Sequence, residues 1–280
     1  MSGFYKGQVC LVTGGNSGIG RELVRHLAAD GATVIAWGRN QRKGVSLVKE
    51  LKKSPGAVSF ETVDVQNPLQ VEHALKQLIE QHQRVDYVFH GVGIILGGEV
   101  RDHTIDEVRA IMQTNVLGTA HVNLYVYQQM VKQGSGHLVN IASGAGLFPL
   151  PLMGVYSASK FAVYGMGEVL RMEGHQLGVK VSTVAPGLVD TPIYERAMYS
   201  RTDKAKTLSS LKKRLYMIQP DQAARVILKG TRRNRAIIHT QLYVRLGWLS
   251  YRYFPHVFRF VTRQFMKPFR SRYRNVDGSP

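Results

Sequence analysis

The chain has 280 residues, of which 44% are hydrophobic, and a formal net charge of +18. With this length and no long polar tract it can bury a substantial core, and one large α/β domain is the simplest organisation. The only cysteine, Cys10, excludes a disulfide framework and a thiolate metal site, which suits a reducing compartment, and we expect no bound metal. No apolar leader precedes the first predicted strand and no uncharged apolar run reaches about 18 residues, so we expect neither a secretory signal nor a membrane span.

The first predicted elements are a strand, Val9 to Val12, a glycine-rich turn and a helix. A diphosphate needs free backbone N–H groups at a helix N-terminus, where peptide dipoles favour negative charge. Glycines allow both the tight turn and the close approach of the phosphates. The turn therefore predicts dinucleotide binding, although its Gly-x-x-x-Gly-x-Gly spacing differs from the most familiar fingerprint. The residues predicted to contact the cofactor here are Gly14, Asn16, Ser17, Gly18, Ile19 and Gly20.

The second predicted strand, Ala32 to Trp37, ends in Gly38 and Arg39. In a dinucleotide-binding fold this position faces the adenosine ribose, where an acidic side chain binds a 2′-hydroxyl and a cation accommodates a 2′-phosphate. Arg39 therefore predicts NADP(H) as the cofactor. The alternative is that Arg39 is a solvated loop charge.

A helix from Gln41 to Lys53 is followed by a third strand, Val58 to Val63, which delivers Asp64 and Val65. An aspartate at the carboxyl end of a strand can accept a hydrogen bond from the adenine amino group, and the next backbone N–H completes the contact. An aspartate in an ordinary surface turn has the same sequence pattern. Pro68 to Gln81 is predicted to form an amphipathic helix.

Strands and helices continue to alternate along the chain. The later predicted elements are a strand from Val85 to Phe89, a helix from Ile105 to about Met130, a strand from His137 to Ala142, a helix from about Met153 and a strand from Val179 to Ala185. This alternation predicts a doubly wound parallel sheet flanked by helices. Ligands are then expected at the carboxyl ends of the strands.

Tyr156 and Lys160 are four residues apart on a predicted helix, so their side chains lie on one face. An ammonium group beside a phenol stabilises the phenolate and lowers its pKa from about 10, so the tyrosine can exchange a proton near neutral pH. Ser143, at the end of a strand, would hydrogen-bond the same substrate oxygen. Lys160 is also expected to bind the nicotinamide ribose. A Tyr–Lys pair alone is a common surface feature, and the glycine turn is what favours the catalytic interpretation.

From about Lys6 to Ile238 the chain resembles the short-chain dehydrogenase/reductase family. The resemblance rests on the glycine turn, Asp64-Val65, Asn115, Ser143, Tyr156-x-x-x-Lys160, and Pro186-Gly187 followed by Thr191. It implies a Rossmann-like sheet of about seven strands, hydride transfer at the nicotinamide C4 and an Asn-Ser-Tyr-Lys tetrad. In that tetrad Asn115 would hold a water that relays protons through Lys160. The further cofactor contacts that the resemblance implies are Gly91, Gly93, Gly187, Val189 and Thr191.

One segment departs from the family pattern. Where the family usually has Asn-Asn-Ala-Gly, this chain has His90-Gly91-Val92-Gly93. Three interpretations of His90 stay open: a substitute hydrogen-bond donor, a satisfied histidine packed at the strand end, or a sign of altered activity. The third motivates an alternative function, a membrane-associated, cofactor-binding protein with little turnover.

Residues 188–218 show no strand pattern, and the resemblance implies that this segment folds over the substrate as a lid. Its methionine, tyrosine and leucine residues predict a hydrophobic substrate. The apolar segment from Leu147 to Met153 would line the opposite wall. The alternative for the lid is an amphipathic surface helix.

The last part of the chain, residues 241–280, leaves the core pattern and is predicted to form a basic amphipathic extension. From Arg232 onward eleven Lys or Arg residues accompany one acidic residue, Asp277, which gives this region a charge of about +10. Pro255 separates two helical patterns. The apolar residues on the first helical face are Leu242, Leu246, Leu249 and Tyr253.

A basic amphipathic segment with aromatic residues is typical of helices that lie on an anionic membrane. We therefore expect peripheral, monotopic membrane contact on the cytoplasmic side. A second copy of the chain in a homo-oligomer is the alternative partner for this face. Nucleic acid is a weaker alternative because no reading module accompanies the arginines, and we expect none to bind.

Taken together, these features predict an NADP(H)-dependent oxidoreductase with a single domain over residues 1–240 and an extension over 241–280. It would transfer hydride between the nicotinamide and a hydrophobic, lipid-like ketone, aldehyde or secondary alcohol.

Overall fold

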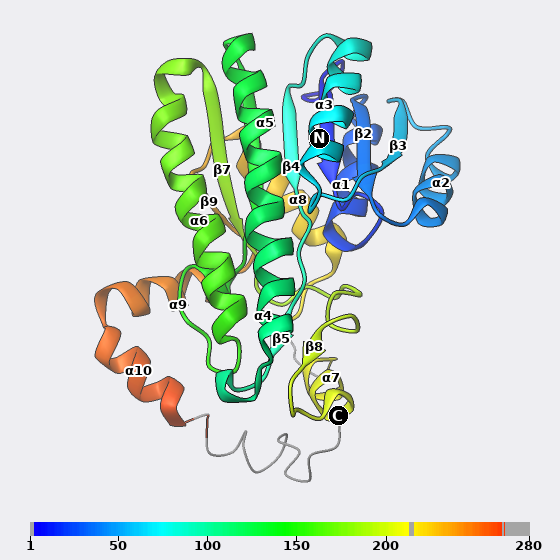
Figure 1. The fold of residues 1–280 in the computed structure, drawn as a ribbon. Helices are drawn as coiled ribbons and strands as arrows, with labels where there is room; N and C mark the ends of the chain where they lie inside the picture. The colour runs from blue at the N-terminus through cyan, green and yellow to red at the C-terminus, as the bar shows by residue number, and fades with distance from the viewer. Residues whose placement is uncertain (1–2, 213–215, 265, 267–280) are drawn as a thin grey trace.

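The computed structural model describes residues 3–212, 216–264 and 266, and its centre is a seven-stranded sheet in the order β3-β2-β1-β4-β6-β7-β9 (Figure 1). Every neighbouring pair in this sheet is parallel, which confirms the predicted doubly wound fold. The strand order reverses between β1 and β4, where such folds bind ligands. The strands are β1 (Val9–Thr13), β2 (Thr33–Gly38), β3 (Val58–Thr62), β4 (Tyr87–His90), β6 (Gly136–Ile141), β7 (Val179–Ala185) and β9 (Ile237–His239).

Helices cover both faces of the sheet because alternate side chains of each strand point to opposite sides. Cys10 and Val12 of β1 pack under one helical layer, and Leu11 packs under the other. The first layer consists of α1 (Gly18–Ala29), α2 (Gln41–Glu50) and α8 (Pro220–Arg232). The second layer, in which α5 and α6 stand in front of the sheet in Figure 1, consists of α3 (Pro68–His82), α5 (Gly118–Gln133) and α6 (Gly154–Gly174).

The helix predicted from Ile105 to about Met130 is present without a break, but its hydrogen-bond pattern changes over one turn. The structure has α4 (Ile105–Ile111), a π-helical turn (Met112–Leu117) and then α5. Within this region the Thr119 hydroxyl donates a 2.6 Å hydrogen bond to the carbonyl oxygen of Asn115. π-Helical turns inside helices recur at functional sites, and this one carries Asn115. Apolar periodicity cannot locate such a turn, because the residues on either side of it keep helical spacing.

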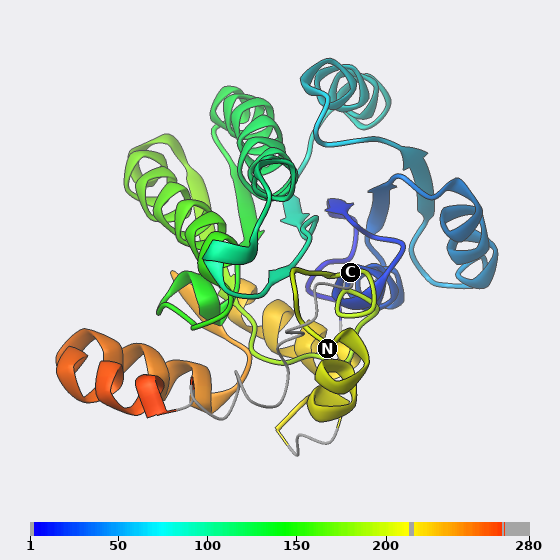
Figure 2. The ribbon, with the colours of Figure 1, turned by 60° about the horizontal axis from the view of Figure 1, so that its bottom comes forward.

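The lid and the C-terminal helices lie at the end of the sheet where the strands end (Figures 1 and 2). Contrary to the predicted absence of strands from the lid, β8 (Met198–Tyr199) pairs in parallel with β5 (Leu96–Gly97). This ladder is too short to leave a periodic pattern in the sequence. The helices here are α7 (Lys204–Lys212), α9 (Leu242–Tyr253) and α10 (Pro255–Gln264).

Parts of the predicted lid and extension, residues 213–215, 265 and 267–280, lie outside the described residues. Among the helices that are described, none is both long and apolar enough to cross a bilayer.

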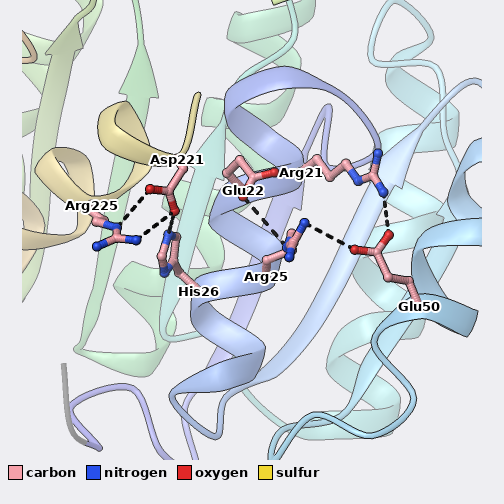
Figure 3. Close-up of polar contacts among 7 residues, drawn as sticks. All are labelled: Arg21, Glu22, Arg25, His26, Glu50, Asp221 and Arg225. Carbon is pink, nitrogen blue, oxygen red and sulfur yellow. Dashed lines mark hydrogen bonds and ion pairs between the residues drawn. The ribbon is translucent and has the colours of Figure 1, made fainter. Parts of the chain in front are cut away.

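A polar cluster joins α1 to α8 on the outside of the first helical layer (Figure 3). Glu22, His26 and Asp221 hold potential ligand atoms within 4.8 Å of one another. However, Arg25 lies 3.8 Å from Glu22, and Arg225 lies 3.0 Å from Asp221. His26 and Asp221 also share a 2.8 Å hydrogen bond. Because both carboxylates are matched by arginines, we interpret this cluster as an ion-pair network that ties the two helices together.

Candidate active site

The strands of the main sheet end at a cavity of about 1420 Å³. It is lined by the glycine turn, by loops that follow β2, β3, β4, β6 and β7, and by the lid. All the predicted site residues except Asn115 line this cavity, and Asn115 is buried behind it. The predicted residues on its wall are Gly14, Asn16, Ser17, Gly18, Ile19, Gly20, Arg39, Asp64, Val65, Gly91, Gly93, Ser143, Tyr156, Lys160, Gly187, Val189 and Thr191.

The glycine turn fits a diphosphate because its backbone leaves no room for side chains. Gly14 and Gly18 have positive φ angles of 71° and 51°, which side chains disfavour. A Cβ atom on Gly20 would lie 2.3 Å from the Gly14 carbonyl oxygen, and one on Gly14 would lie 3.3 Å from the backbone of Gly91. The turn therefore brings the N-terminus of α1 to the cavity wall with its backbone uncovered, as phosphate binding requires.

The end of β2 is fixed against this turn. The Asn16 amide donates a 3.0 Å hydrogen bond to the carbonyl oxygen of Asn40, and a Cβ atom on Gly38 would lie 2.9 Å from the Asn16 side chain. Arg39 follows Gly38 and is well exposed, with its guanidinium group 3.9 Å from the Asp64 carboxylate. The predicted adenosine-binding residues therefore share one edge of the cavity.

The structure brings Ser143, Tyr156 and Lys160 together at the inner end of the cavity. Tyr156 and Lys160 come from the first turns of α6, and both are nearly completely buried. Ser143 lies in the loop after β6, two residues past the end of the strand, and hydrogen-bonds the Tyr156 side chain. The Lys160 ammonium group lies 5.9 Å from the centre of the Tyr156 ring and donates a 3.3 Å hydrogen bond to the Ile141 carbonyl oxygen.

The acid–base properties of this pair differ from the sequence-based prediction that Lys160 lowers the pKa of Tyr156. Burial raises the pKa of Tyr156 to about 12, and the hydrogen bond from Ser143 opposes this only in part. Burial also lowers the pKa of Lys160 to about 8. The prediction was wrong for this structure because loss of solvation outweighs the other effects on the phenol. Tyr156 is therefore protonated at neutral pH, which is the form that donates a proton.

Asn115 stands behind Lys160 and is held by its amide group. Its Oδ1 accepts a 2.8 Å hydrogen bond from the Ile94 N–H, and its Nδ2 donates to the Ile94 carbonyl and to Ser159 Oγ, both at 3.0 Å. A Cβ atom on Gly93 would lie 3.1 Å from Lys160 Nζ and 3.3 Å from Asn115 Oδ1. Sequence analysis missed Ser159, because a serine inside a helix gives no signal that it holds a particular partner.

The rest of the cavity is largely apolar, and the C-terminal helices contribute to it. Phe258 of α10 packs against Phe148 with ring centres 5.7 Å apart, and Val244 of α9 is buried beside it. The sequence does not reveal this contribution, because the helical patterns after residue 240 differ from the core pattern. The division of the chain near residue 240 stays a prediction. The apolar lining includes Ile95, Leu150, Met153, Ile193, Tyr194, Tyr199 and, from α10 onward, Phe258 and Met266.

Comparison with known proteins identifies the family. Residues 8–201 match the family model described as short chain dehydrogenase. The chain belongs to the short-chain dehydrogenase family. A protein named "uncharacterized oxidoreductase" from Staphylococcus epidermidis is 31% identical over 199 residues, which cover 71% of this chain and 85% of that protein. One with the same description from Staphylococcus aureus is 34% identical over 199 residues, which cover 71% of this chain and 84% of the relative.

Solved structures of short-chain dehydrogenases share the fold. One from Burkholderia phymatum, in complex with NAD, matches with a TM-score of 0.78 and 25% identity over 88% of this chain and 94% of its own. One from Sphingobium yanoikuyae, in complex with NADPH, matches in fold with a TM-score of 0.75 and 22% identity over 97% of this chain and 98% of its own.

As a short-chain dehydrogenase, the chain is an oxidoreductase that acts between CH–OH and C=O with a nicotinamide dinucleotide. The predicted family and fold are confirmed. The alternative of a binding protein with little turnover gains no support, because the relatives are oxidoreductases.

We predict that Gly20→Ala weakens NADPH and NADH binding alike by about tenfold or more, a loss of roughly 1.4 kcal/mol or more. The added Cβ would meet the Gly14 carbonyl oxygen, which is backbone and can move only if the turn moves. Nicotinamide fluorescence titration measures both affinities. Gly165→Ala is the matched control, because nothing lies within 4 Å of a Cβ atom at that position. Equal cofactor affinity in the two variants would contradict the assignment of the turn.

Proposed function

We propose that this chain is an NADP(H)-dependent oxidoreductase that interconverts hydrophobic, lipid-like ketones or aldehydes with their alcohols at a membrane surface. The observation that carries the proposal is Tyr156, buried beside Ser143 at the inner end of a largely apolar cavity, where burial raises its pKa to about 12. An apolar lining favours an apolar substrate, and the Ser143 and Tyr156 hydroxyls supply the polar groups that orient one oxygen atom.

The side chains divide the chemistry among them. NADPH, when bound, would supply the hydride for the carbonyl carbon. Ser143 would donate a hydrogen bond to the carbonyl oxygen and polarise it, and Tyr156 would give that oxygen its proton. The Lys160 ammonium group would hold the ribose and stabilise the phenolate that remains, and Asn115 would support the return of a proton through water. Gly187, Val189 and Thr191 would contact the nicotinamide half.

Tyr156→Phe tests the reaction, because the variant keeps the ring and removes only the proton donor. We expect turnover to fall by about 10²- to 10⁴-fold, while NADPH binding is retained. The measurement is NADPH consumption with a panel of long-chain ketones and aldehydes in detergent. Tyr127→Phe, on α5 and away from the cavity, is the control and should turn over normally. Turnover that survives in Tyr156→Phe would sink the proposed mechanism.

The preference for NADP(H) rests on the end of β2. Gly38 presents no carboxylate to the ribose, and the exposed Arg39 beside it supplies a cation. The Asp64 carboxylate, 3.9 Å away, helps to keep the guanidinium at the edge of the cavity. Guanidinium groups suit phosphate because their N–H donors match its geometry.

Arg39→Ala should therefore weaken NADPH binding by about tenfold or more and leave NADH binding unchanged, since hydrogen bonds to charged groups contribute roughly 1.5–3 kcal/mol. Fluorescence titration of both cofactors gives the two affinities. Arg109→Ala, an exposed arginine of α4 that pairs with Asp106, is the matched control. A wild-type protein that binds NADH more tightly than NADPH would show that the Arg39 argument is wrong.

The membrane part of the proposal rests on the outer surface of α9 and α10, which we call the C-terminal face. Large apolar side chains there stay exposed although other residues of the same helices pack inward. Phe260 and Leu242, for example, are 65% and 68% exposed. An exposed apolar patch of this kind marks an interaction surface. The exposed apolar residues of the C-terminal face are Leu242, Leu246, Tyr253, Phe254, Val257, Phe260 and Val261.

The positive charge of the C-terminal face favours an anionic partner. Four exposed arginines lie on these helices, at positions 245, 252, 259 and 263, and residues 242–264 contain no aspartate or glutamate. A symmetric dimer would press this face against its own copy and bring arginines together. The anionic lipids of a cytoplasmic leaflet would instead attract them. We therefore favour a membrane over a second copy of the chain.

Helix α10 lies between the exposed C-terminal face and the cavity. One side of this helix reaches the cavity through Phe258 and Thr262, while Val257, Phe260 and Val261 are exposed. A lipid-like substrate would therefore need to pass only one helix between the bilayer and the cavity. Such a short route avoids exposing the apolar substrate to water.

Vesicle flotation tests the C-terminal face without requiring turnover. We expect the protein to float with phosphatidylcholine vesicles that contain phosphatidylserine, and less so at high salt because salt screens the arginines. The double variant Leu246→Glu/Phe260→Glu should reduce partitioning by roughly tenfold or more. Leu69→Glu, which charges an exposed apolar residue of α3, is the control. Equal flotation of the double variant, or self-association that the double variant abolishes, would contradict membrane binding.

A further inference from the structure

His90 occupies the segment in which this chain departs from its family, and the structure gives both of its ring nitrogens a partner. The side chain is fully buried at the end of β4. Its Nδ1 lies 2.8 Å from Thr13 Oγ1, and its Nε2 lies 3.0 Å from Thr119 Oγ1. Thr13 is its register partner on β1, and Thr119 belongs to the first turn of α5. Of the three interpretations, the satisfied histidine at the strand end matches this geometry.

The directions of these hydrogen bonds follow from the number of protons available. The Thr119 hydroxyl donates its single proton to the Asn115 carbonyl oxygen at 2.6 Å, so it can only accept from His90. His90 therefore carries its proton on Nε2, and its Nδ1 accepts from the Thr13 hydroxyl. The Thr13 oxygen in turn accepts from the Gly91 N–H at 3.2 Å. All the bonds in this chain are thus satisfied by one tautomer.

The two ends of the chain lie in different parts of the active site. Thr13 directly precedes Gly14, the first residue of the glycine turn. Asn115 belongs to the π-helical turn and stands behind Lys160. A single imidazole therefore spans from the cofactor side of the site to the residue that supports the reacting pair.

His90 is neutral around pH 7. Burial lowers its pKa to about 3, and the positive charge of Lys160 acts in the same direction. A neutral ring keeps one donor and one acceptor, which is what the two threonine hydroxyls require.

We propose that His90 is a positioning residue: it fixes the π-helical turn against the glycine turn and thereby holds Asn115 in place behind Lys160. The effect on turnover rests on the proposed function, whereas the structural link does not. A family-type asparagine at position 90 offers a shorter side chain and would leave one of the two threonines without its ring partner.

The first test needs no substrate. Nitrogen-15 NMR of histidine-labelled protein should show a buried histidine that is neutral and protonated at Nε2 from pH 6 to pH 9, and this signal should be absent from His90→Asn. Amide exchange over residues 112–119 should rise by about tenfold or more in His90→Asn. His137→Asn is the matched control, since His137 of β6 is also buried and its Nε2 lies 2.9 Å from Ser182 Oγ of β7. A signal protonated at Nδ1, or unchanged exchange over residues 112–119, would overturn the proposal.

The second test is a double-mutant cycle on turnover. If His90 acts through Asn115, His90→Asn alone should lower turnover by about 10- to 100-fold and shift its pH profile, but should cost nothing further in an Asn115→Ala background. Effects that multiply, or a pH profile that moves no more than in His137→Asn, would overturn the role in positioning. Thr119→Val breaks the same link if His90→Asn does not fold. A wild-type protein without turnover would contradict the proposed function and leave the exchange test of His90 intact.

Discussion

Close backbone packing where β1 and β4 end is the constraint on which this active site depends. A side chain at Gly14 or Gly20 would meet backbone atoms, and one at Gly93 would meet Lys160 and Asn115. The glycines therefore do two things at once: they open the N-terminus of α1 toward the cavity, and they let the lysine and the asparagine approach each other across the chain. Both groups of glycines line the same cavity, so close packing places the glycine turn and Lys160 on one wall.

Burial then decides the chemistry of the groups around this point. Burial raises the pKa of Tyr156 to about 12 and lowers that of Lys160 to about 8. At neutral pH the phenol is therefore protonated, and the ammonium group of Lys160 loses its proton more readily than that of an exposed lysine. The same exclusion of water from a largely apolar cavity supports the proposed apolar substrate. The proposed membrane surface is apolar like the cavity, and α10 joins the two, because one side of this helix lines the cavity and another side is exposed.

The parts of the fold and site that the sequence predicts are those encoded locally. The glycine turn after a strand, the four-residue spacing of Tyr156 and Lys160, and the alternation of strands and helices each lie within a short segment, and the structure brings them together as expected. The features that sequence analysis missed depend on contacts between distant segments. The pKa of Tyr156 depends on how deeply it is buried, and the contribution of α10 to the cavity depends on tertiary packing.

The π-helical turn and the partners of His90 belong to the same class. One turn of helix loses its regular spacing without any change in the apolar pattern, and the ring of His90 joins threonines that are more than a hundred residues apart along the chain. These features coincide at Asn115, so the least predictable part of the fold lies directly behind Lys160.

The most direct test of the central claim follows the hydride itself. Purified protein is incubated with a long-chain ketone or aldehyde and NADPH deuterated at C4, and the alcohol is analysed by mass spectrometry. The account predicts one deuterium on the carbinol carbon of the product, with NADPH preferred over NADH as the donor. Absence of label from the product of every apolar carbonyl compound tested, or transfer only from NADH, would contradict it.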